Sequence, residues 1–288
     1  MLDSVGTVLI IGRPNVGKSL LFNKLISFPL SIVSDKKGTT RDLITGLYND
    51  HDSEILFLDT PGVSKTYNHL MQNINKVSLN YIDEADVILF VIDLKRGIIK
   101  EDKELLKSLD KNKKVFLIMN KIDGLKKELV YSSISYFQSL FSFQEIIPVS
   151  AKTGFNVKEI INTLKKYLPQ GYKRYEENLT FNSLNFLISE IVREGINHYI
   201  YEELPDEIST KTLSYDKNKN YLKVEIIIKR ESIKKILIGK NGEKIKKIKK
   251  YAKERLRDLL GSDLNLELVI QTDKNYQENY LKERRDIS

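Results

Sequence analysis

Residues 12–19, GRPNVGKS, have the types and spacing needed to hold a polyphosphate. The segment matches GxxxxGK[ST] and lies between an apolar run and a helical pattern, as this motif requires. Its glycines let backbone N–H groups wrap around phosphates, and the N-terminus of the following helix attracts negative charge. Lys18 would reach the β- and γ-phosphates and Ser19 would hold Mg²⁺, which indicates a nucleoside triphosphatase without identifying its base. The predicted phosphate loop consists of Gly12, Arg13, Pro14, Asn15, Val16, Gly17, Lys18 and Ser19.

A second motif, Asp59-Thr60-Pro61-Gly62, follows the apolar run EILFLDT. An aspartate at this place can bind Mg²⁺ through water, and Gly62 can turn its N–H toward the γ-phosphate. By itself the motif is equally consistent with an ordinary turn after a strand. The phosphate loop upstream favours the functional interpretation.

Between these two motifs, the segment TTRD offers a hydroxyl that could ligate Mg²⁺ and respond to the γ-phosphate. We favour Thr40 over Thr39 for this role. The sequence thus predicts three Mg²⁺ ligands, Ser19, Thr40 and Asp59, and three residues that act directly in hydrolysis, Lys18, Thr40 and Gly62.

The base that such a site would hold is indicated by NKID, at the end of the apolar run KVFLIMNK. The carboxylate of Asp123 can accept from both N1–H and the 2-amino group of guanine, whereas adenine offers no such pair of donors. An unpaired carboxylate against adenine would cost on the order of a few kcal/mol. The later SAK segment fits a loop whose backbone N–H meets the guanine O6, although SAK after a strand is common by itself. The predicted guanine contacts are Asn120, Lys121, Asp123, Ser150, Ala151 and Lys152.

These motifs need a scaffold that brings the ends of several strands together, and residues 1–168 have the pattern of one. Short branched-aliphatic runs alternate with helix-length segments, which is typical of strands buried on both faces of a mainly parallel sheet. The predicted strands are VGTVLIIG, EILFLDT, DVILFVIDL, KVFLIMNK and EIIPVS, and the predicted helices are Gly17–Ser27, Asn68–Asp83, Glu101–Lys111, Lys126–Phe141 and Asn156–Tyr167. A polar NDHD turn indicates a hairpin that adds one antiparallel strand. We therefore predict a doubly wound α/β domain with six strands.

A Pro–Gly break at residues 168–171 ends this alternation and marks a predicted domain boundary. We assign residues 1–169 to the first domain, 170–181 to a linker, and 182–288 to a second domain with a polar C-terminal tail. The second domain is predicted to have the order αββααβ. Its helices would be Ser183–Tyr199, Ser232–Leu237 and Glu243–Leu260, and its strands Glu207–Tyr215, Tyr221–Lys229 and Leu264–Thr272.

The turn between the last two of these helices, GKNG at residues 239–242, is a candidate second site. A helix–GxxG–helix with a basic second helix is the centre of a KH domain, whose loop clamps about four single-stranded nucleotides, and the order αββααβ is that of a type II KH fold. The glycines would let the backbone approach phosphates, the lysines would add charge, and flanking isoleucines would form an apolar floor under the bases. The predicted RNA contacts are Ile236, Ile238, Gly239, Lys240, Asn241, Gly242, Lys244 and Lys247.

The distribution of charge favours a polyanion as the partner of this second site. Residues 229–257 contain 13 lysines and arginines against three glutamates, whereas the whole chain has a net charge of only +8. A solvated helix face and a patch for acidic membrane lipids are the alternatives. The chain has no cysteine, its start predicts a strand rather than a signal peptide, and no apolar run approaches the roughly 18–20 residues of a membrane span. Disulfides, Cys-based zinc sites and transmembrane segments are therefore not expected.

The combination of GRPNVGKS, TTRD, DTPGV, NKID and SAK with a C-terminal KH module resembles the Era family of bacterial GTPases over nearly the whole chain. The resemblance implies a cytoplasmic GTPase that associates in part with the inner face of the cell membrane. It also implies binding to the 3′ region of 16S ribosomal RNA and a role in maturation of the small ribosomal subunit. We expect the protein to be a monomer.

Two positions bear on how fast GTP would be hydrolysed. Many GTPases carry a glutamine that orients the attacking water directly after Asp-x-x-Gly, but Val63 occupies that position here. Valine cannot hydrogen-bond to water, so unaided hydrolysis is expected to be slow. In related GTPases an asparagine in the phosphate loop helps to hold a K⁺ ion; Asn15 would either do so here or only shape the loop.

We hypothesise that GTP and Mg²⁺ order the loops around Thr40 and Asp59–Val63 and so reposition the RNA surface, whereas hydrolysis to GDP permits release. Two alternatives remain open. One is an RNA or membrane adaptor that binds GTP without meaningful turnover, which Val63 would favour. The other is a GTPase that acts in a different process such as tRNA modification, which the KH signature opposes.

Overall fold

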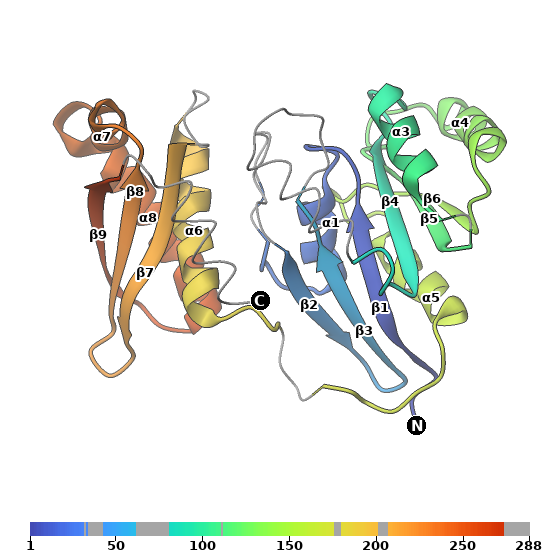
Figure 1. Cartoon of the computed structure of the whole chain (residues 1–288), viewed down its shortest axis with the longest axis horizontal. Coiled ribbons are helices and arrows are strands. Elements are labelled where there is room, and N and C mark those ends of the chain that lie inside the picture. The colour runs from blue at the N-terminus through green and yellow to red at the C-terminus, as the bar shows by residue number, and fades with distance from the viewer. Residues whose placement is uncertain are drawn as a thin grey trace. The chain divides into compact units, whose positions relative to one another are not determined.

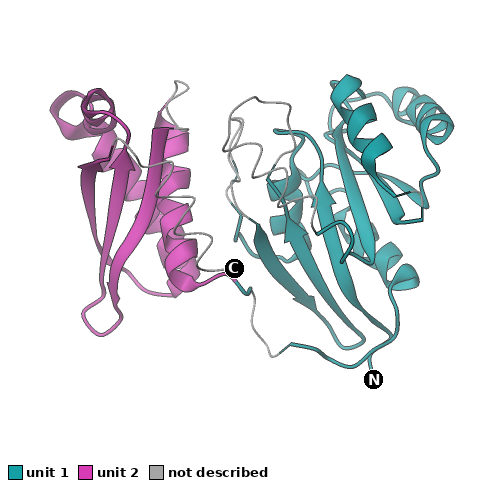
Figure 2. Cartoon of the chain, in the orientation of Figure 1, with its two compact units in different colours: residues 1–181 teal, residues 182–288 magenta. Residues whose placement is uncertain are grey.

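The structure is a computed structural model of the whole chain, and it describes residues 1–31, 33, 43–61, 81–110, 112–175, 180–200 and 207–273 (Figure 1). The chain divides into two compact units, residues 1–181 and residues 182–288 (Figure 2). Each unit has its own sheet and its own buried core. Among the described residues, no helix has the length and hydrophobicity needed to span a lipid bilayer.

The sheet of the first unit has six strands in the order β2-β3-β1-β4-β5-β6. Neighbouring strands are parallel except for β2, which is antiparallel to β3 and forms the predicted hairpin with it. The strands are β1 (Ser4–Ile11), β2 (Ile44–Asn49), β3 (Ser53–Asp59), β4 (Val87–Asp93), β5 (Lys114–Asn120) and β6 (Glu145–Pro148). The prediction of a mainly parallel six-stranded sheet is confirmed.

Helices cover both faces of this sheet. All seven residues of β4 are buried, which requires cover on both sides. On one face, Leu106 and Phe137 from two helices share a core with Phe90. On the other face, Phe116 makes an edge-to-face contact with Tyr167. The described helices of this unit are α1 (Lys18–Leu25), α3 (Lys100–Ser108), α4 (Lys127–Leu140) and α5 (Val157–Tyr167).

Two of the helices predicted for this unit are not matched over their full length. The helix predicted over Glu101–Lys111 ends at Ser108, because Leu109 has an extended backbone that turns the chain out of the helix. The helix predicted over Asn68–Asp83 lies outside the described residues up to position 80, and residues 81–84 form a turn. The other helices of this unit begin and end within two residues of their predicted positions.

The segment that we predicted as a linker lies against the first unit where it is described. The carboxylate of Glu54, which is buried, accepts a hydrogen bond from the N–H of Arg174 (2.7 Å). The N–H of Phe181 donates to the hydroxyl of Thr45 on β2 (2.9 Å). Both ends of this segment are therefore held at the β2–β3 edge of the sheet.

The second unit has the predicted order αββααβ. Its three-stranded sheet has the order β7-β8-β9, with β7 antiparallel and β9 parallel to the central strand. The elements are α6 (Leu184–Tyr199), β7 (Ile208–Asp216), β8 (Tyr221–Ile228), α7 (Glu231–Ile238), α8 (Glu243–Leu260) and β9 (Asn265–Thr272). The predicted α+β fold of this half is confirmed.

One face of this sheet carries the core of the second unit. In β8, buried residues alternate strictly with half-buried ones, in contrast to the fully buried β4. The buried set of β8 packs with an apolar stripe of α8 that has the same i, i+3, i+4 spacing as a helix facing a core. The fully buried residues of this stripe are Ile248, Ala252 and Leu256, and the partly buried Ile245, Leu259 and Leu260 complete it. The basic side chains of α8 are therefore left at its surface.

Candidate functional site

The carboxyl ends of the parallel strands bring the nucleotide motifs together. Strands β1, β3, β4 and β5 run in the same direction, so their last residues lie along one edge of the sheet (Figure 1). The register places Ile10 beside Asp59 and Asp93 beside Asn120. The phosphate loop, DTPG and NKID follow these strands directly, and SAK follows β6 in the same way. This edge is where ligands bind in open parallel α/β sheets.

The phosphate loop requires glycine at both ends of its turn. Gly12 has a φ of 150°, and a Cβ there would lie 2.3 Å from the carbonyl oxygen of Val91. Gly17 has a φ of 98°, and a Cβ there would lie 2.3 Å from Nδ2 of Asn120. Helix α1 begins at Lys18 without a side-chain cap, which is the arrangement that binds phosphate at a helix N-terminus.

Lys18 is buried beneath the loop, with 5% of its surface exposed. Its Nζ donates hydrogen bonds to the carbonyl oxygens of Gly12 (3.1 Å) and Arg13 (3.0 Å). Burial lowers the pKa of Lys18 to about 8, and the charge of Asp59 partly opposes this shift. An ammonium in this position gains a stronger partner when a polyphosphate occupies the loop.

Asp59 has a fully buried carboxylate whose Oδ1 has no hydrogen-bond partner within the described part of the chain. Its Oδ2 accepts from the hydroxyl of Ser31 (2.7 Å). Burial raises the pKa of Asp59, while the charge of Lys18 and the hydroxyls of Ser31 and Ser19 offset part of the shift. A buried carboxylate oxygen beside a serine hydroxyl is a donor set that suits Mg²⁺, so Ser19 and Asp59 fit the predicted metal site.

Ser31 is a member of this site that the sequence motifs did not identify. Its N–H donates to Oδ1 of Asn23 (2.8 Å), and its carbonyl oxygen accepts from Nδ2 of the same side chain (2.8 Å). Asn23 lies on α1, so the helix after the phosphate loop also fixes the group that orients Asp59. No motif spacing links these positions.

Of the DTPG motif, Asp59, Thr60 and Pro61 are described, whereas the TTRD segment lies outside the described residues. The hydroxyl of Thr60 donates to the carbonyl oxygen of Ile10 (2.7 Å), which joins the end of β3 to β1. Pro61 is buried next to it. Thr40, Gly62 and Val63 lie outside the described residues, so their assigned roles stay predictions.

Arg13 points its side chain away from the loop. Its Nε donates to Oδ1 of Asp102 (2.6 Å), and its Nη2 donates to the carbonyl oxygen of Gly97 (3.3 Å). Asp102 is fully buried in the first turn of α3. The Arg13 side chain therefore braces the phosphate loop against α3, and a nucleotide contact by this residue would use its backbone.

Asn120 connects three loops through one amide. Its Nδ2 donates to the carbonyl oxygen of Val16 in the phosphate loop (2.8 Å). Its Oδ1 accepts from the N–H of Ala151 in the SAK segment (3.0 Å). Asn120 and Ala151 are both buried, and the next residue, Lys152, is exposed. The amide thus fixes the distance between the phosphate side and the base side of the predicted site.

Lys121 makes a second connection of this kind. Its backbone is left-handed, with a φ of 64°. Its Nζ donates to the carbonyl oxygen of Asn15 (2.6 Å) and to Oδ2 of Asp93 (2.8 Å). Asp93 ends β4 and was not among the predicted site residues, although an acid at the end of a buried strand was a usable signal.

Asp123 presents the carboxylate predicted to select guanine, with 25% of its side chain exposed. Its Oδ2 pairs with Nζ of Lys95 (3.0 Å), and its Oδ1 accepts from the hydroxyl of Ser150 (2.9 Å). The hydrogen bond from Lys95, followed by that from Ser150, holds the pKa of Asp123 below its usual value. The group is therefore ionised at neutral pH and offers only acceptors, as guanine recognition requires.

The GxxG turn forms a second candidate site in the other unit. A three-residue 3₁₀ turn separates α7 from α8, and Gly239, Asn241 and Gly242 all have positive φ values, 72°, 52° and 74°. A Cβ on Gly239 would lie 2.9 Å from Cβ of Lys244, whereas a Cβ on Gly242 would meet nothing within 4 Å. Of these two glycines, only the first is therefore required by close packing.

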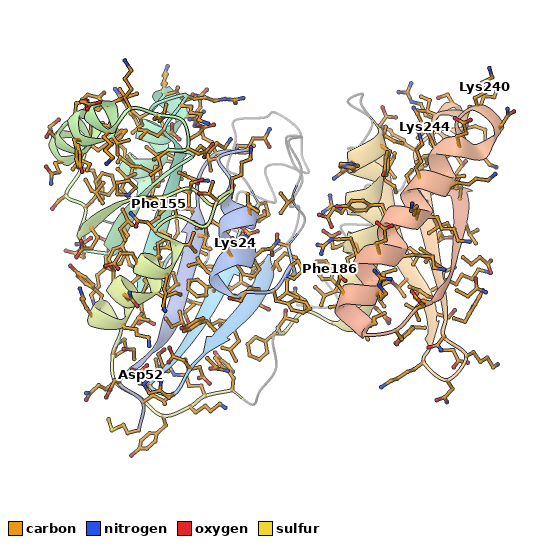
Figure 3. All side chains as sticks on the ribbon, turned by 180° about the vertical axis from the view of Figure 1, so that it is seen from behind. Lys24, Asp52, Phe155, Phe186, Lys240 and Lys244 are labelled. Carbon is orange, nitrogen blue, oxygen red and sulfur yellow. The ribbon has the colours of Figure 1, made fainter. Side chains whose placement is uncertain are left out.

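The side chains around the GxxG turn differ in how far they are exposed to solvent. Figure 3 shows Lys240 and Lys244 at the same end of α8. Lys240, Asn241 and Lys247 are exposed, and Lys244 is half-buried. Ile236 and Ile238 are half-buried beside the turn, whereas Ile233 and Leu237 belong to the core. The turn thus presents cations and partly exposed apolar groups side by side.

Comparison with known families gives a match in each unit. Residues 7–121 match the family described as 50S ribosome-binding GTPase, and residues 196–276 match the KH domain family. The chain is similar to GTPase Era of Staphylococcus epidermidis, with 37% identity over 278 residues that cover 94% of this chain and 93% of the relative. GTPase Era of Staphylococcus haemolyticus is 39% identical over the same length and coverage.

Two solved structures have the same arrangement of elements over both units. One is a crystal structure of Era in complex with MgGDPNP and nucleotides 1506–1542 of 16S ribosomal RNA, with a TM-score of 0.90 and 37% identity. The other is a single-substitution variant of Aquifex aeolicus Era bound to GDP and AlF4⁻, also with a TM-score of 0.90 and 37% identity. Each alignment covers 95% of this chain and 95% of the solved chain.

Proposed function

This chain belongs to the Era family of GTPases, and on this premise we propose that its nucleotide state controls its binding to the 3′ region of 16S ribosomal RNA. By this binding it would assist maturation of the small ribosomal subunit. One observation carries the proposal: a guanine-nucleotide framework and a GxxG turn stand in one chain, and the similarity to GTPase Era runs over both. In the crystal structure of another Era protein, MgGDPNP and nucleotides 1506–1542 of 16S ribosomal RNA are bound in the same complex.

In the first unit, the residues described above would bind GTP in two parts. Asp123 would accept from guanine, with Asn120 and the SAK segment fixing the distance to the phosphates. The loop backbone and Lys18 would hold the phosphates, and Lys18 would exchange its two carbonyl partners for phosphate oxygens. Gly62 would donate its N–H to the γ-phosphate.

The metal site of the same unit would use Ser19, Asp59 and Thr40. The buried Oδ1 of Asp59 supports this assignment, because a carboxylate oxygen without a partner is costly unless a cation or donor joins it. Mg²⁺, when bound, would neutralise charge on the β- and γ-phosphates. Thr40 would sense the γ-phosphate from its loop and so distinguish GTP from GDP.

Hydrolysis would proceed without a glutamine after Gly62. We propose that Asn15, in a left-handed conformation with a φ of 65°, helps to hold a K⁺ ion that adds positive charge at the phosphates. Multiple-turnover GTP hydrolysis should then be faster in K⁺ than in Na⁺ at equal ionic strength. An equal rate in both salts would remove the K⁺ proposal without affecting Mg²⁺.

The division of labour would follow the predicted boundaries. Residues 1–169 would act as the GTPase domain, 170–181 as the connection and 182–288 as the KH domain. The protein would act as a monomer in the cytoplasm and associate in part with the inner face of the cell membrane. The basic surface of α8 supports both an RNA partner and contact with acidic lipids.

The RNA part of the proposal is tested by crosslinking RNA in cells to the wild type and to a Gly239→Asp, Gly242→Asp variant. Wild-type crosslinks should lie near the 3′ end of 16S ribosomal RNA, and the variant should lose them, because two carboxylates would face the phosphates. Crosslinks that persist unchanged in the variant would contradict the KH assignment. Crosslinks to transfer RNA would favour the alternative of a GTPase that acts in a process such as tRNA modification.

The coupling between the units needs a separate measurement. Affinity for a 16S 3′ RNA fragment should be higher with a non-hydrolysable GTP analogue than with GDP. Equal affinity in the two states would leave both activities in place but remove their coupling.

A further inference from the structure

One hydrogen bond at the candidate metal site comes from a residue outside the sequence motifs. The hydroxyl of Ser31 donates to Oδ2 of Asp59 (2.7 Å), whereas Oδ1 of the same carboxylate has no partner within the described residues. The two oxygens of a carboxylate turn together, so a donor fixed on one of them sets the direction of the other. The hydrogen bond from Ser31 therefore holds Oδ1 in a defined place.

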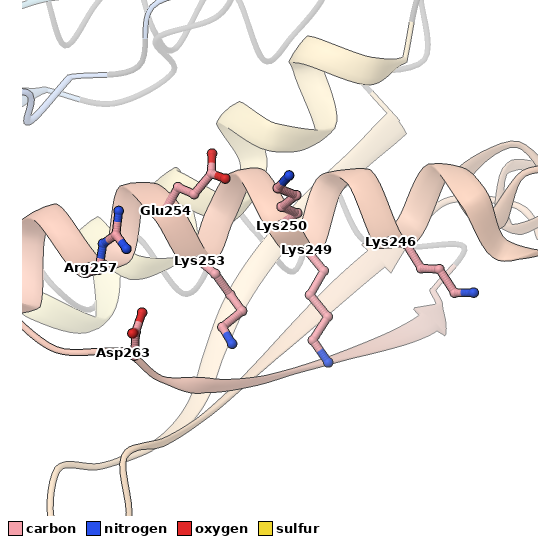
Figure 4. Close-up of a pocket in the computed structure, with 7 residues that line it drawn as sticks. All are labelled: Lys246, Lys249, Lys250, Lys253, Glu254, Arg257 and Asp263. Carbon is pink, nitrogen blue, oxygen red and sulfur yellow. The ribbon is translucent and has the colours of Figure 1, made fainter.

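This hydrogen bond is shielded from solvent, because Ser31 and Asp59 both have 0% of their surface exposed. In contrast, the open groove on α8 in Figure 4 is lined by side chains such as Lys249 and Lys253 that extend away from the helix. Water and salt screen exposed charges of that kind, whereas a hydrogen bond to a buried charge contributes more than a neutral one. Loss of the single hydroxyl of Ser31 should therefore have a measurable effect.

Ser31 is itself held in place by α1. Its N–H and its carbonyl oxygen are both hydrogen-bonded to the side chain of Asn23, at 2.8 Å each. The carbonyl oxygen of Asn23 also accepts from the N–H of Phe28 (3.1 Å), in the turn that leads to Ser31. Asn23 lies one helical turn after Ser19, the predicted metal ligand on α1. The described contacts that place the Ser31 hydroxyl thus come from a regular helix rather than from a nucleotide-sensing loop.

We propose that Ser31 is a positioning residue for Mg²⁺: its hydroxyl holds Asp59 so that Oδ1 is available to the metal or to a metal-bound water, with GDP and with GTP alike. This role rests on the metal site of the proposed function. Thr40 would respond to the γ-phosphate and act only in the GTP state, whereas the connection from α1 through Ser31 to Asp59 needs no γ-phosphate. Since Mg²⁺ neutralises charge on the phosphates, Ser31 would slow the loss of GDP as well as the loss of GTP.

The test measures release of a fluorescent GDP, and of a fluorescent non-hydrolysable GTP analogue, from the full chain between EDTA and saturating Mg²⁺. The test variant is Ser31→Ala, which removes only the hydroxyl. The matched control is Ser53→Ala, because Ser53 is also 0% exposed and its hydroxyl also donates to an aspartate, Asp50, at 2.7 Å. Ser53 begins β3, about 20 Å along the strand from Asp59 at its other end.

We expect Ser31→Ala to need about tenfold more Mg²⁺ for half-maximal retention of either nucleotide. Residues that orient metal ligands typically contribute about 10- to 100-fold to metal affinity, and the lower value is expected where the ligand binds through water. In EDTA, the variant and the wild type should release each nucleotide at the same rate. Ser53→Ala should match the wild type at every Mg²⁺ concentration, and urea unfolding should show similar stability for both variants.

A second variant acts on the same hydroxyl without removing it. Asn23→Ala leaves Ser31 in the chain but removes both hydrogen bonds that hold its backbone. The Mg²⁺ requirement should rise in the same direction as in Ser31→Ala and by a smaller factor. If Ser31→Ala does not fold, Asn23→Ala decides the proposal. Thr40→Ala should raise the requirement only with the GTP analogue.

Three results would overturn the role of Ser31. One is an unchanged Mg²⁺ requirement, and another is equally faster release in EDTA, which would assign Ser31 to the general structure of the site. The third is a shift confined to the GTP analogue, which would group Ser31 with Thr40. Asp59→Asn separates the two proposals. If this variant keeps the wild-type Mg²⁺ requirement, the proposed metal site fails; if it raises the requirement and Ser31→Ala does not, only the role of Ser31 fails.

Discussion

The nucleotide site and the GxxG surface are built differently, although both are proposed to bind phosphates. In the first, side-chain hydrogen bonds connect loops from different strands: Asn120 joins Val16 to Ala151, and Lys121 joins Asn15 to Asp93. In the second, the conformation of the turn is set by backbone angles at Gly239, Asn241 and Gly242, and the side chain of Lys240 is exposed.

This difference predicts how each surface responds to change. A connected and partly buried site has its geometry fixed before the ligand binds, so a single substitution should have a large effect. A row of exposed charges acts through many weak and screened interactions, so its effects should be small, additive and salt-dependent.

The largest effect is expected from Asp123→Asn. The amide would present an N–H group to a guanine donor, so one favourable hydrogen bond is lost and one repulsive contact appears. We expect GTP affinity to fall about 100- to 1000-fold, or about 3–4 kcal/mol, while xanthosine triphosphate, which has an oxygen at position 2, binds better. Fluorescent nucleotide titration measures both. Asp110→Asn, in the loop that follows α3, is the control. A loss of less than tenfold at position 123 would contradict the assigned base contact.

The next effect concerns the backbone of the GxxG turn. Gly239 has φ 72° and ψ 178°, a combination that is essentially restricted to glycine, whereas Gly242 has φ 74° and ψ 14°, which asparagine adopts readily. Gly239→Asn should therefore destabilise the protein by about 2–3 kcal/mol, and Gly242→Asn by less than about 1 kcal/mol.

Urea unfolding of both variants, followed by a signal from the second unit, compares the two glycines directly. The contact that a Cβ on residue 239 would make with Lys244 adds to the backbone strain, and the space around residue 242 is open. Equal destabilisation by the two substitutions would show that the turn is less fixed than its backbone angles indicate.

A third prediction uses the lowered pKa of Lys18, which is about 8. Bound phosphates raise this pKa, so GTP binding takes up a proton above pH 8, and affinity should fall up to about tenfold per pH unit between about pH 8 and 9. Lys18→Arg should bind GTP more weakly but without this slope. A wild-type affinity that stays flat over this range would contradict a buried, titrating Lys18.

The stability of the nucleotide-free protein should change in the opposite direction. Between pH 8 and 10.5, the unfolded chain keeps a proton on Lys18 that the folded chain has released. The unfolded state therefore binds more protons, and the contribution of this group to the free energy of unfolding rises with pH over that window. Urea unfolding at fixed ionic strength measures this change, with Lys18→Arg as the reference.

Much of this fold was predictable because the apolar pattern of each strand matches the number of its faces that are buried in the tertiary structure. Unbroken apolar runs predicted β4 and its neighbours as strands covered on both faces, and the alternating residues of β8 fit a sheet with a single covered face. The end of α3 was missed because LDKN continues a helical composition, whereas the chain turns at Leu109 to reach β5. Propensity alone does not fix such an end.

The motif residues of the candidate site could be located from spacing, but their supporting residues could not. Ser31, Lys95 and Asp102 contact motif residues that are 28 to 89 positions away in the sequence. Nothing in the local pattern marks such pairs, because they exist only once the strands are aligned. Arg13 shows the converse: it lies in a motif, but its side chain is used by the scaffold.

The smallest effect is expected from Lys95, the one cation in the described residues that pairs with the guanine-selecting carboxylate of Asp123. The pair is at 3.0 Å, but 43% of the Lys95 side chain is exposed, so solvent screens most of its attraction. Guanine needs the same carboxylate oxygens, and Lys95 competes with it. Lys95→Met should therefore raise GTP affinity by up to about fivefold, mainly through faster association, with Lys107→Met as a control of equal charge. A loss of affinity in Lys95→Met would show instead that this lysine stays in place and orients Asp123, which would make the base side of the site as interlocked as its phosphate side.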